Sequence, residues 1–310
     1  MRGIKPALIA AAVFLAACGG PGPTGEERGA RVSTGRLETY EDFKATGLSN
    51  RDVQVWLPEG YSEKAANGRK YAVLYMHDGQ MLYDASVTWN KQEWGVDEVA
   101  GQLMANGTVR DFIIVGIFNG GDSRHADYLP EKPYRMLPDD VKQDYYGIEA
   151  PALKADEYVA FLADELKPFI DNHYATLTGP EDTAVMGSSM GGLISWYAFT
   201  ERPDVFGMAA CMSTHWPGFE PEKSTGMPAA FMAYMRANLP APEGRKIYFD
   251  YGDQTLDAHY PPLQKQVDAM MVDLGYDETN WRTVYAPGAD HSEVSWNKRL
   301  PGAFTFLFGK

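Results

Sequence analysis

Cysteine is nearly absent from this chain, whose 310 residues include only Cys18 and Cys211. Cys18 lies close to the N-terminus and Cys211 lies inside the apolar stretch AACM. We therefore expect neither a structural disulfide nor a cysteine-based metal site. The adjacent residues His77 and Asp78 are weak candidates for metal ligands, because no third ligand accompanies them. We expect no metal and no other cofactor.

Basic residues are scarce relative to acidic ones. Lys and Arg number 28, against 42 Asp and Glu, and the formal net charge is −14. This balance argues against nucleic acid and against an anionic membrane surface as partners. Aromatic residues are plentiful at 13%, which favours a globular fold over disorder. One α/β domain of about 250 to 280 residues would account for most of the chain, so its length does not demand a second domain.

The apolar run at the N-terminus, Ala7 to Ala17, is too short to span a bilayer. It follows Arg2 and Lys5, as in a secretory signal peptide, which we predict over residues 1–17. Leu15-Ala16-Ala17-Cys18 resembles the bacterial lipobox, in which the cysteine becomes the lipidated first residue. An ordinary signal peptide with a chance cysteine is the alternative. We expect an exported protein that is anchored to a bacterial membrane only through a lipid at Cys18 and faces the periplasm.

The rest of the chain alternates between predicted strands and helices. Residues 18–34 are rich in Gly, Pro and charge and predict a flexible tether before a folded domain over 35–310. Apolar or alternating stretches predict strands at 51–57, 71–76, 112–118, 206–212, 246–251 and 281–285. Periodic apolar residues predict a helix over 155–170 that kinks or ends near Pro168, another from Pro261 to Gly275, and a terminal helix or turn through 304–308.

This alternation predicts an α/β fold with a mostly parallel central sheet and helices on both faces. The segment Pro217 to Gly244 interrupts the alternation. We expect it to form a small inserted helical segment over the carboxyl edge of the sheet, where ligands bind in open α/β folds.

The ten residues TAVMGSSMGG at 183–192 combine a strand end, a Gly-x-Ser-x-Gly turn and the first turn of a helix. A serine on such a tight turn is held in a strained backbone conformation, which small neighbours tolerate, and its hydroxyl projects free of the sheet. The pattern therefore predicts Ser189 as a nucleophile. A glycine-rich turn with no catalytic role is the alternative. The presence of a candidate base and a candidate acid elsewhere in the sequence decides between the two.

A serine nucleophile needs a base, usually a histidine that a carboxylate orients, and α/β hydrolases supply them in the order serine, acid, histidine. His291 follows the last predicted strand and is the expected base, with a surface histidine of no role as the alternative. The acid should follow the strand at 246–251, where Asp253 and Asp257 compete. We favour Asp257, because Asp253 is close enough to the strand end to be a turn residue. Asp290 is interpreted as a solvated neighbour of His291.

The transition state also needs donors for the developing oxyanion. The backbone N–H of Met190, directly after the nucleophile, is one expected donor. The other is expected in the loop after an early strand, which by position is His77-Asp78-Gly79-Gln80.

Five motifs, MHDGQ, GSSMGG, STHW, YGDQTLDAHY and GADHSEVSW, occur in this order along the chain. Together they resemble the putative esterase family of the α/β-hydrolase superfamily, which includes enterochelin esterases, feruloyl esterases, S-formylglutathione hydrolases and the mycolyltransferases of the antigen 85 group. The resemblance extends from Val53 to Phe308. It implies an α/β-hydrolase fold and the backbone N–H of Gln80 as the second oxyanion donor. Relatives often place the acid where Thr255 stands here, so Asp257 implies a slightly longer loop.

Three further residues are candidates for the substrate pocket. His215 and Trp216 follow the strand next to the elbow and are expected to face the mouth of the site, with a buried aromatic corner as the alternative. Arg124, in GGDSRHADYLP, could contact an anionic or catechol substrate, although a solvated loop arginine is the favoured interpretation.

Together these features predict a serine carboxylic-ester hydrolase with a Ser-His-Asp triad, an acyl-enzyme intermediate and a small-molecule or glycan-linked ester as substrate. Acyl transfer of the mycolyltransferase type is an alternative, since it differs only in which alcohol or water reaches the intermediate. A noncatalytic binding protein on a hydrolase scaffold is the alternative from another class, and the presence of both Ser189 and His291 disfavours it.

Overall fold

The computed structural model describes residues 29–146, 152–223 and 226–310. The predicted signal peptide, Cys18 and most of the predicted tether lie outside the described residues. The last part of that tether lies against the domain: the N–H of Arg31 donates to Asp84 (2.9 Å), and the N–H of Ser33 donates to Asp97 (2.7 Å). Contacts with the domain thus begin before Gly35.

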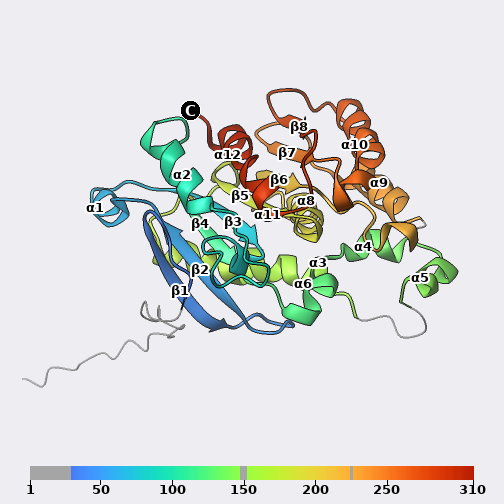
Figure 1. Cartoon of the computed structure of the whole chain (residues 1–310), viewed down its shortest axis with the longest axis horizontal. Coiled ribbons are helices and arrows are strands. Elements are labelled where there is room, and N and C mark those ends of the chain that lie inside the picture. The colour runs from blue at the N-terminus through green and yellow to red at the C-terminus, as the bar shows by residue number, and fades with distance from the viewer. Residues whose placement is uncertain (1–28, 147–151, 224–225) are drawn as a thin grey trace, which may run out of the picture.

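Eight strands form one sheet in the order β1-β2-β4-β3-β5-β6-β7-β8 (Figure 1). The strands are β1 (Arg36–Phe43), β2 (Arg51–Leu57), β3 (Ala72–His77), β4 (Phe112–Ile117), β5 (Thr183–Ser188), β6 (Met208–Met212), β7 (Lys246–Tyr251) and β8 (Trp281–Tyr285). Strand β2 pairs antiparallel with both β1 and β4, and every other pairing is parallel. The predicted α/β class and mostly parallel sheet are therefore confirmed.

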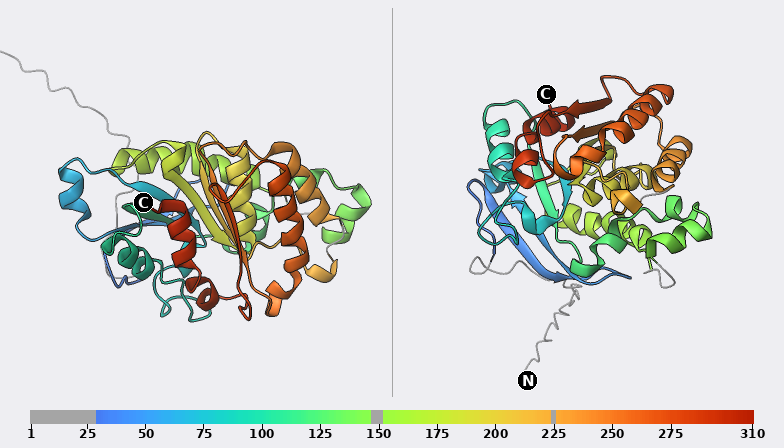
Figure 2. Two further views of the ribbon diagram at one scale, coloured as in Figure 1. Left: turned by 90° about the horizontal axis from the view of Figure 1, so that it is seen from above. Right: turned by 45° about the vertical axis from the view of Figure 1, so that its right-hand side comes forward.

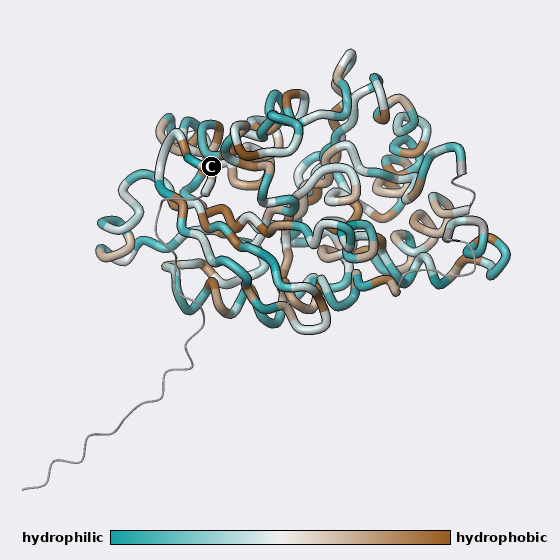
Figure 3. Tube along the Cα trace, turned by 60° about the horizontal axis from the view of Figure 1, so that its bottom comes forward, coloured by the Kyte–Doolittle hydropathy of each residue, from teal (hydrophilic) through white to brown (hydrophobic). Residues whose placement is uncertain are grey.

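The central strands are buried on both faces, as their continuous apolar sequences predict. Alternate residues of β3 face opposite sides: Val73 and Tyr75 belong to one core, Leu74 and Met76 to the other. In Figure 3, hydrophobic stretches of the chain run through the middle of the molecule. Since each face needs its own cover, a parallel sheet of this kind requires helices on both sides.

Helices cover both faces of the sheet (Figure 2). One core includes residues of α6 (Ala155–Ala160), α7 (Lys167–His173), α8 (Met190–Glu201), α9 (Met227–Asn238) and α10 (Pro261–Asp273). The other includes residues of α2 (Val96–Ala105), α11 (Glu293–Asn297) and α12 (Leu300–Phe308). The shorter elements are α1 (Tyr61–Ala66), η1 (Gly79–Met81), η2 (Gly121–Ser123), α3 (Arg124–Tyr128), α4 (Glu131–Arg135), α5 (Asp139–Tyr146), η4 (Pro180–Asp182), η5 (Pro221–Lys223) and η6 (Thr255–His259).

The helix predicted to kink or end near Pro168 instead continues to His173. A π-helical stretch, η3 (Phe161–Leu166), joins α6 to α7, and Pro168 stands in the first turn of α7. Proline lacks an N–H and clashes with the carbonyl four residues earlier in a regular α-helix. The wider π turns change that spacing just upstream, which explains why the helix continues past Pro168.

The predicted insertion contains η5 and α9, and α9 packs against α4, α8 and α10. Its residues from Gly218 to Pro221 line a cavity together with Ser189. Within the described part of the chain, no helix has both the length and the apolar character needed to cross a membrane.

Candidate active site

The candidate site lies where the central strands end. Loops after β3, β5, β6, β7 and β8 carry, in that order, Gln80, Ser189, His215, Asp257 and His291. The carboxyl ends of parallel strands meet at one edge of the sheet, so five segments that are far apart in sequence converge there. Ser189 and His291 line one cavity of about 580 Å³.

Ser189 has the geometry of a nucleophile elbow. It stands between the end of β5 at Ser188 and the first residue of α8, with φ 58° and ψ −123°. Non-glycine residues rarely adopt this conformation, which costs on the order of 1–3 kcal/mol. The neighbouring chain holds it, because the Ser189 N–H donates to Met212 O (3.0 Å) and its carbonyl accepts from the His215 N–H (3.1 Å).

Glycine at position 187 makes this turn possible. A Cβ there would lie 2.9 Å from backbone atoms of Gly191. The strand end and the first turn of α8 therefore approach each other more closely than any side chain allows. The second glycine of the motif has no such constraint, since a Cβ at Gly191 would meet its nearest neighbours at 3.5 Å.

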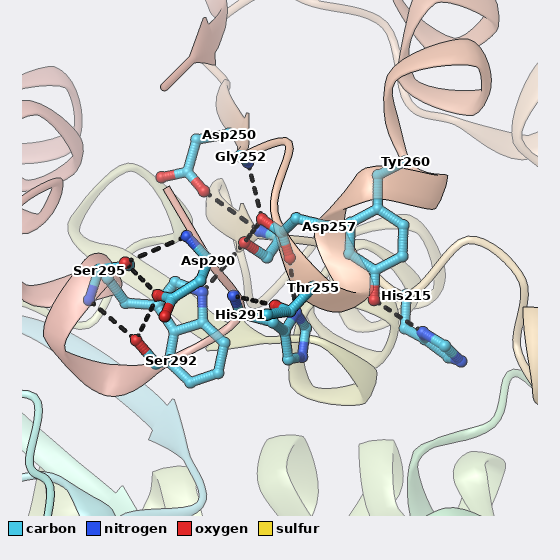
Figure 4. A network of polar contacts seen from close by, with 12 residues as sticks. His215, Asp250, Gly252, Thr255, Asp257, Tyr260, Asp290, His291, Ser292 and Ser295 are labelled. Carbon is cyan, nitrogen blue, oxygen red and sulfur yellow. Dashed lines mark hydrogen bonds and ion pairs between the residues drawn. The ribbon is translucent and has the colours of Figure 1, made fainter. Parts of the chain in front are cut away.

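Asp257 and His291 are joined by a hydrogen bond of 2.6 Å between Oδ1 and Nδ1 (Figure 4). Asp257 is fully buried, and its Oδ2 accepts from the Gly252 N–H (2.7 Å). The His291 backbone N–H donates to Thr255 Oγ1 (3.0 Å), which fixes the loop that carries the imidazole. A neutral imidazole that donates from Nδ1 presents an unprotonated Nε2, the state that a general base requires.

The competing carboxylates have other partners. Asp253 accepts hydrogen bonds from Gln254 Nε2 (2.7 Å), the Gly288 N–H (2.9 Å) and the Tyr285 hydroxyl. These bonds, led by that from Tyr285, lower the pKa of Asp253. Asp290 accepts from Ser292 Oγ (2.6 Å) and from Ser295 Oγ (Figure 4). The structure thus brings Asp257, and neither Asp253 nor Asp290, to His291.

The two residues expected to supply the oxyanion donors, Met190 and Gln80, each line a cavity with Ser189. Met190 is the first residue of α8, and the N–H groups in the first turn of a helix have no acceptor within that helix. Gln80 is the middle residue of η1, directly after the β3 loop. Its side-chain Oε1 accepts from the Asn119 N–H (3.3 Å), so the β4 loop supports the β3 loop.

Arg124 is an ion-paired residue of the cavity wall and not a solvated loop arginine. Its Nε and Nη2 bind both carboxylate oxygens of Asp78, at 2.7 and 2.8 Å. Burial alone would raise the pKa of Asp78, but Arg124 and the amide of Asn119 (2.7 Å) lower it overall. Asp78 has φ 56°, so this pair also holds the backbone turn that leads to Gln80. Arg124 lines the same cavity as Ser189, so the favoured interpretation of a solvated loop arginine is wrong and the pocket alternative fits.

His215 lines an apolar cavity of about 470 Å³ beside Ser189. Burial lowers the pKa of His215 to about 4, so its imidazole is neutral at neutral pH. Its Nε2 lies 2.8 Å from the carbonyl of Phe219 and must therefore carry the proton. Nδ1 is then an acceptor, and the Tyr260 hydroxyl donates to it at 2.8 Å (Figure 4). The Ser189 hydroxyl in turn interacts with the Tyr260 oxygen.

Trp216 does not face the pocket, so this prediction is wrong. Its side chain is fully buried, with the ring between Trp196 and Phe249, and its indole N–H donates to Gln264 Oε1 (2.9 Å). In the loop after β6, His215 thus lines the cavity beside Ser189, while Trp216 enters the core.

Sequence reasoning missed three residues around the site. Tyr260 and Ser213 lie inside the quoted motifs, but nothing in their spacing shows that Ser213 Oγ binds Asp257 Oδ2 (2.6 Å). Trp89 lines the larger cavity and is 82% exposed. The sequence did offer a signal for Trp89, because it stands among polar residues in SVTWNKQ. Large aromatic side chains are normally buried, so a tryptophan in a polar stretch is a candidate for a binding role.

His77 and Asp78 are used within the fold. His77 Nδ1 lies 2.8 Å from the Tyr158 hydroxyl, and burial lowers the pKa of His77 to about 3. Asp78 is occupied by Arg124 and Asn119. Among the residues that the structure describes, no group of three or more His, Cys, Asp or Glu side chains could hold a metal ion.

Residues 46–307 match the family model described as "Putative esterase". The chain belongs to this esterase family. Its fold is the α/β-hydrolase fold, and the protein is a serine carboxylic-ester hydrolase. The family match covers most of the sheet and every loop of the candidate site.

Known proteins that resemble this esterase include enzymes named for ester hydrolysis. An uncharacterized protein of Bacillus subtilis, YbbA, is 23% identical over 265 residues, which are 84% of this chain and 94% of YbbA. An endo-1,4-beta-xylanase/feruloyl esterase of Xylanibacter ruminicola is 28% identical over 190 residues, 59% of this chain but 22% of that protein. The solved enterobactin esterase of Shigella flexneri shares the fold, with a TM-score of 0.61 and 18% identity over 92% of this chain and 60% of that one.

Proposed function

We propose that this esterase works through a Ser189–His291–Asp257 triad and an acyl-enzyme intermediate. The 2.6 Å bond between Asp257 Oδ1 and His291 Nδ1 is the observation that carries the proposal. It joins a buried carboxylate to a histidine that shares a cavity with the elbow serine. Serine, acid and base on three converging loops, after β5, β7 and β8, are the arrangement that acyl transfer to serine requires.

In this mechanism Ser189 Oγ attacks the ester carbonyl while His291 Nε2 takes its proton. Asp257 keeps the imidazole in the required tautomer and stabilises the imidazolium that forms. The N–H groups of Met190 and Gln80 stabilise the oxyanion, and one such donor is worth about 3–4 kcal/mol of barrier. His291 then protonates the departing alcohol, and a water molecule, activated in the same way, releases the acid.

The two cavities that meet at Ser189 support a division of the substrate between them. The smaller cavity is lined by Met190, Phe219, Pro221 and Leu256, an apolar surface that suits the acyl group. The larger one is lined by polar residues, among them Asn90, Asn119 and Arg124, together with Trp89 and Trp296, and suits an alcohol that has both polar and apolar parts. We propose a small-molecule or glycan-linked ester as the substrate. The feruloyl and enterobactin esterases among the similar proteins support this class.

A serine-directed fluorophosphonate probe tests the nucleophile. The wild-type protein should be labelled, and Ser189→Ala should not, because the probe needs an activated serine. Ser188→Ala is the matched control, since Ser188 is the neighbouring residue at the strand end and its variant should still be labelled. Equal labelling of Ser189→Ala, or no labelling of the folded wild type, would contradict the proposal. A panel of aliphatic and aromatic acyl esters then identifies the preferred acid.

We also propose that the protein is exported and anchored to the membrane through a lipid at Cys18. The proposal rests on the sequence of residues 1–18, in which a basic start, an apolar run and a lipobox-like Leu-Ala-Ala-Cys follow one another. A mature chain that begins at Cys18 would lose Arg2 and Lys5 and carry a formal net charge of −16.

A further inference from the structure

Ser213 lies directly behind the acid of the proposed triad. It follows β6 and is fully buried, with a positive φ of 40°, which residues other than glycine rarely adopt. Its backbone N–H donates to the carbonyl oxygen of Asp250 (2.9 Å) and to Asp250 Oδ1 (3.1 Å). Strand β7 therefore holds the backbone of Ser213 in the conformation that points its hydroxyl at the site.

Three groups surround the Ser213 hydroxyl, and two of them can only donate. Trp296 Nε1 lies 3.0 Å from Ser213 Oγ, and Arg299 Nη2 lies 2.7 Å from it. The third is Asp257 Oδ2, at 2.6 Å. Indole and guanidinium nitrogens have no acceptor capacity, and a hydroxyl has one proton and two lone pairs. Both lone pairs are therefore used, and the proton of Ser213 must go to Asp257.

This fixed direction determines the orientation of the Asp257 carboxylate. Oδ2 accepts from both Ser213 and the Gly252 N–H, and these two bonds fix its position. With Oδ2 held in this way, Oδ1 is left facing His291 Nδ1.

Arg299 can occupy this buried position because Asp250 balances its charge. Arg299 Nε lies 3.1 Å from Asp250 Oδ2, and both side chains are almost completely buried. An isolated guanidinium would be costly there, whereas the pair brings a strong donor to Ser213 without adding net charge. Trp296 and Arg299 come from the C-terminal segment, Asp257 follows β7, and Ser213 follows β6. The hydroxyl of Ser213 thus joins three separate parts of the chain.

We propose that Ser213 and Arg299 are positioning residues of this esterase, which hold Asp257 in the single orientation that lets Oδ1 accept the Nδ1 proton of His291. The inference rests on the triad proposed above. The inference adds two residues that affect the reaction only through Asp257. A purely structural role would not depend on Asp257.

A double-mutant cycle tests this path of action. Ser213→Ala should lower kcat by roughly 10- to 100-fold, the effect of losing one hydrogen bond to a charged group, with KM within about twofold. In an Asp257→Asn background the same substitution should cause no further loss of kcat. Ser195→Ala, which removes a buried hydroxyl bonded to Gly191 O inside α8, is the matched control and should change kcat in neither background.

A second variant covers the case in which Ser213→Ala fails to fold. Asp250→Asn combined with Arg299→Met removes the buried ion pair as a unit and leaves neither charge uncompensated. It should lower kcat by about 10-fold, again only when Asp257 is present. Thermal unfolding should establish that each variant is folded at the assay temperature.

The outcomes separate this inference from the proposed function. If Asp257→Asn loses activity while Ser213→Ala and the double variant keep it, the positioning role is wrong and the triad stands. The role is also wrong if these substitutions lower kcat by the same factor in both backgrounds. If Asp257→Asn keeps full activity, the triad itself is wrong and the inference fails with it.

Discussion

At the scale of single residues, Asp253 and Asp257 lie only four residues apart in one loop but have different roles, Asp253 as a turn residue and Asp257 as the acid of the proposed triad. Both follow β7 and both are hydrogen-bonded. Asp253 binds the Gly288 N–H near the surface, while Asp257 is buried and binds His291. The difference lies in η6, which turns Asp257 back under the strand end.

Asparagine substitutions should separate the two carboxylates. Asp257→Asn should lower kcat by about 10⁴-fold, because an asparagine amide can hold His291 in the wrong tautomer and cannot stabilise the imidazolium. Asp253→Asn, the matched control, should change kcat by less than about twofold. Steady-state kinetics on an ester that the wild type hydrolyses would measure both. A large loss in Asp253→Asn with little in Asp257→Asn would mean that the acid has been assigned to the wrong residue.

Local motifs made Ser189 and His291 predictable from the sequence. Each lies in a short pattern whose geometry is set by its immediate neighbours, a tight turn for the serine and a post-strand loop for the histidine. Trp216 was predicted wrongly, because the side of the chain it occupies depends on Trp196, Phe249 and Gln264, which are distant in sequence. Contacts such as that between Ser213 and Arg299 likewise have no local pattern.

At the scale of elements, the junction of β5 and α8 depends on the two glycines of the Gly-x-Ser-x-Gly motif unequally. The first turn of α8 crosses the end of β5 at Gly187, where a Cβ would be 2.9 Å from backbone atoms. Backbone cannot move aside as a flexible side chain can. At Gly191 the nearest atoms are those of His77 and Asp78, at ordinary contact distance.

Alanine substitutions should reveal this asymmetry. Gly187→Ala should destabilise the protein by about 1–3 kcal/mol, the usual cost of overpacking, and should slow fluorophosphonate labelling of Ser189 as the elbow shifts. Gly191→Ala places alanine inside a helix, where it is favoured over glycine by roughly 0.5–1 kcal/mol, and should leave stability equal or higher. Chemical denaturation and labelling rates would measure both effects. Equal destabilisation by the two variants would contradict this account of the elbow.

Elements with a strong period were predictable, and those that depend on distant packing were not. The predicted strands β2 to β4 and β6 to β8 carry apolar runs or clear alternation, and all are present. Strand β1 has the polar sequence RLETYEDF, of which only Tyr40 and Phe43 are buried, so it gives little signal. The π-helical stretch at Phe161–Leu166 could not be anticipated either, because its sequence reads as one continuous helix with its neighbours.

At the scale of the whole molecule, one α/β domain carries the complete candidate site. The family match over 46–307 spans β2 to α12 almost entirely, and the five site loops all come from this unit. The excess of acidic residues disfavours direct adsorption to an anionic bilayer. A protein of this kind would need a separate device to remain at a membrane, and the only candidate that the sequence offers is Cys18.

Removal of that cysteine should release the protein without affecting its chemistry. Cys18→Ala should move the protein from the membrane fraction to the soluble fraction, because in this proposal the acyl chains at Cys18 would supply nearly all of its membrane affinity. Its kcat/KM in detergent-free extract should equal that of the detergent-solubilised wild type, since the predicted anchor precedes every residue of the catalytic domain. Cys211→Ala is the matched control: Cys211 is buried in β6, so this variant should stay in the membrane fraction. Fractionation followed by immunoblotting would measure the distribution, and membrane retention of Cys18→Ala would show that the protein is held there by something other than a lipid at this residue.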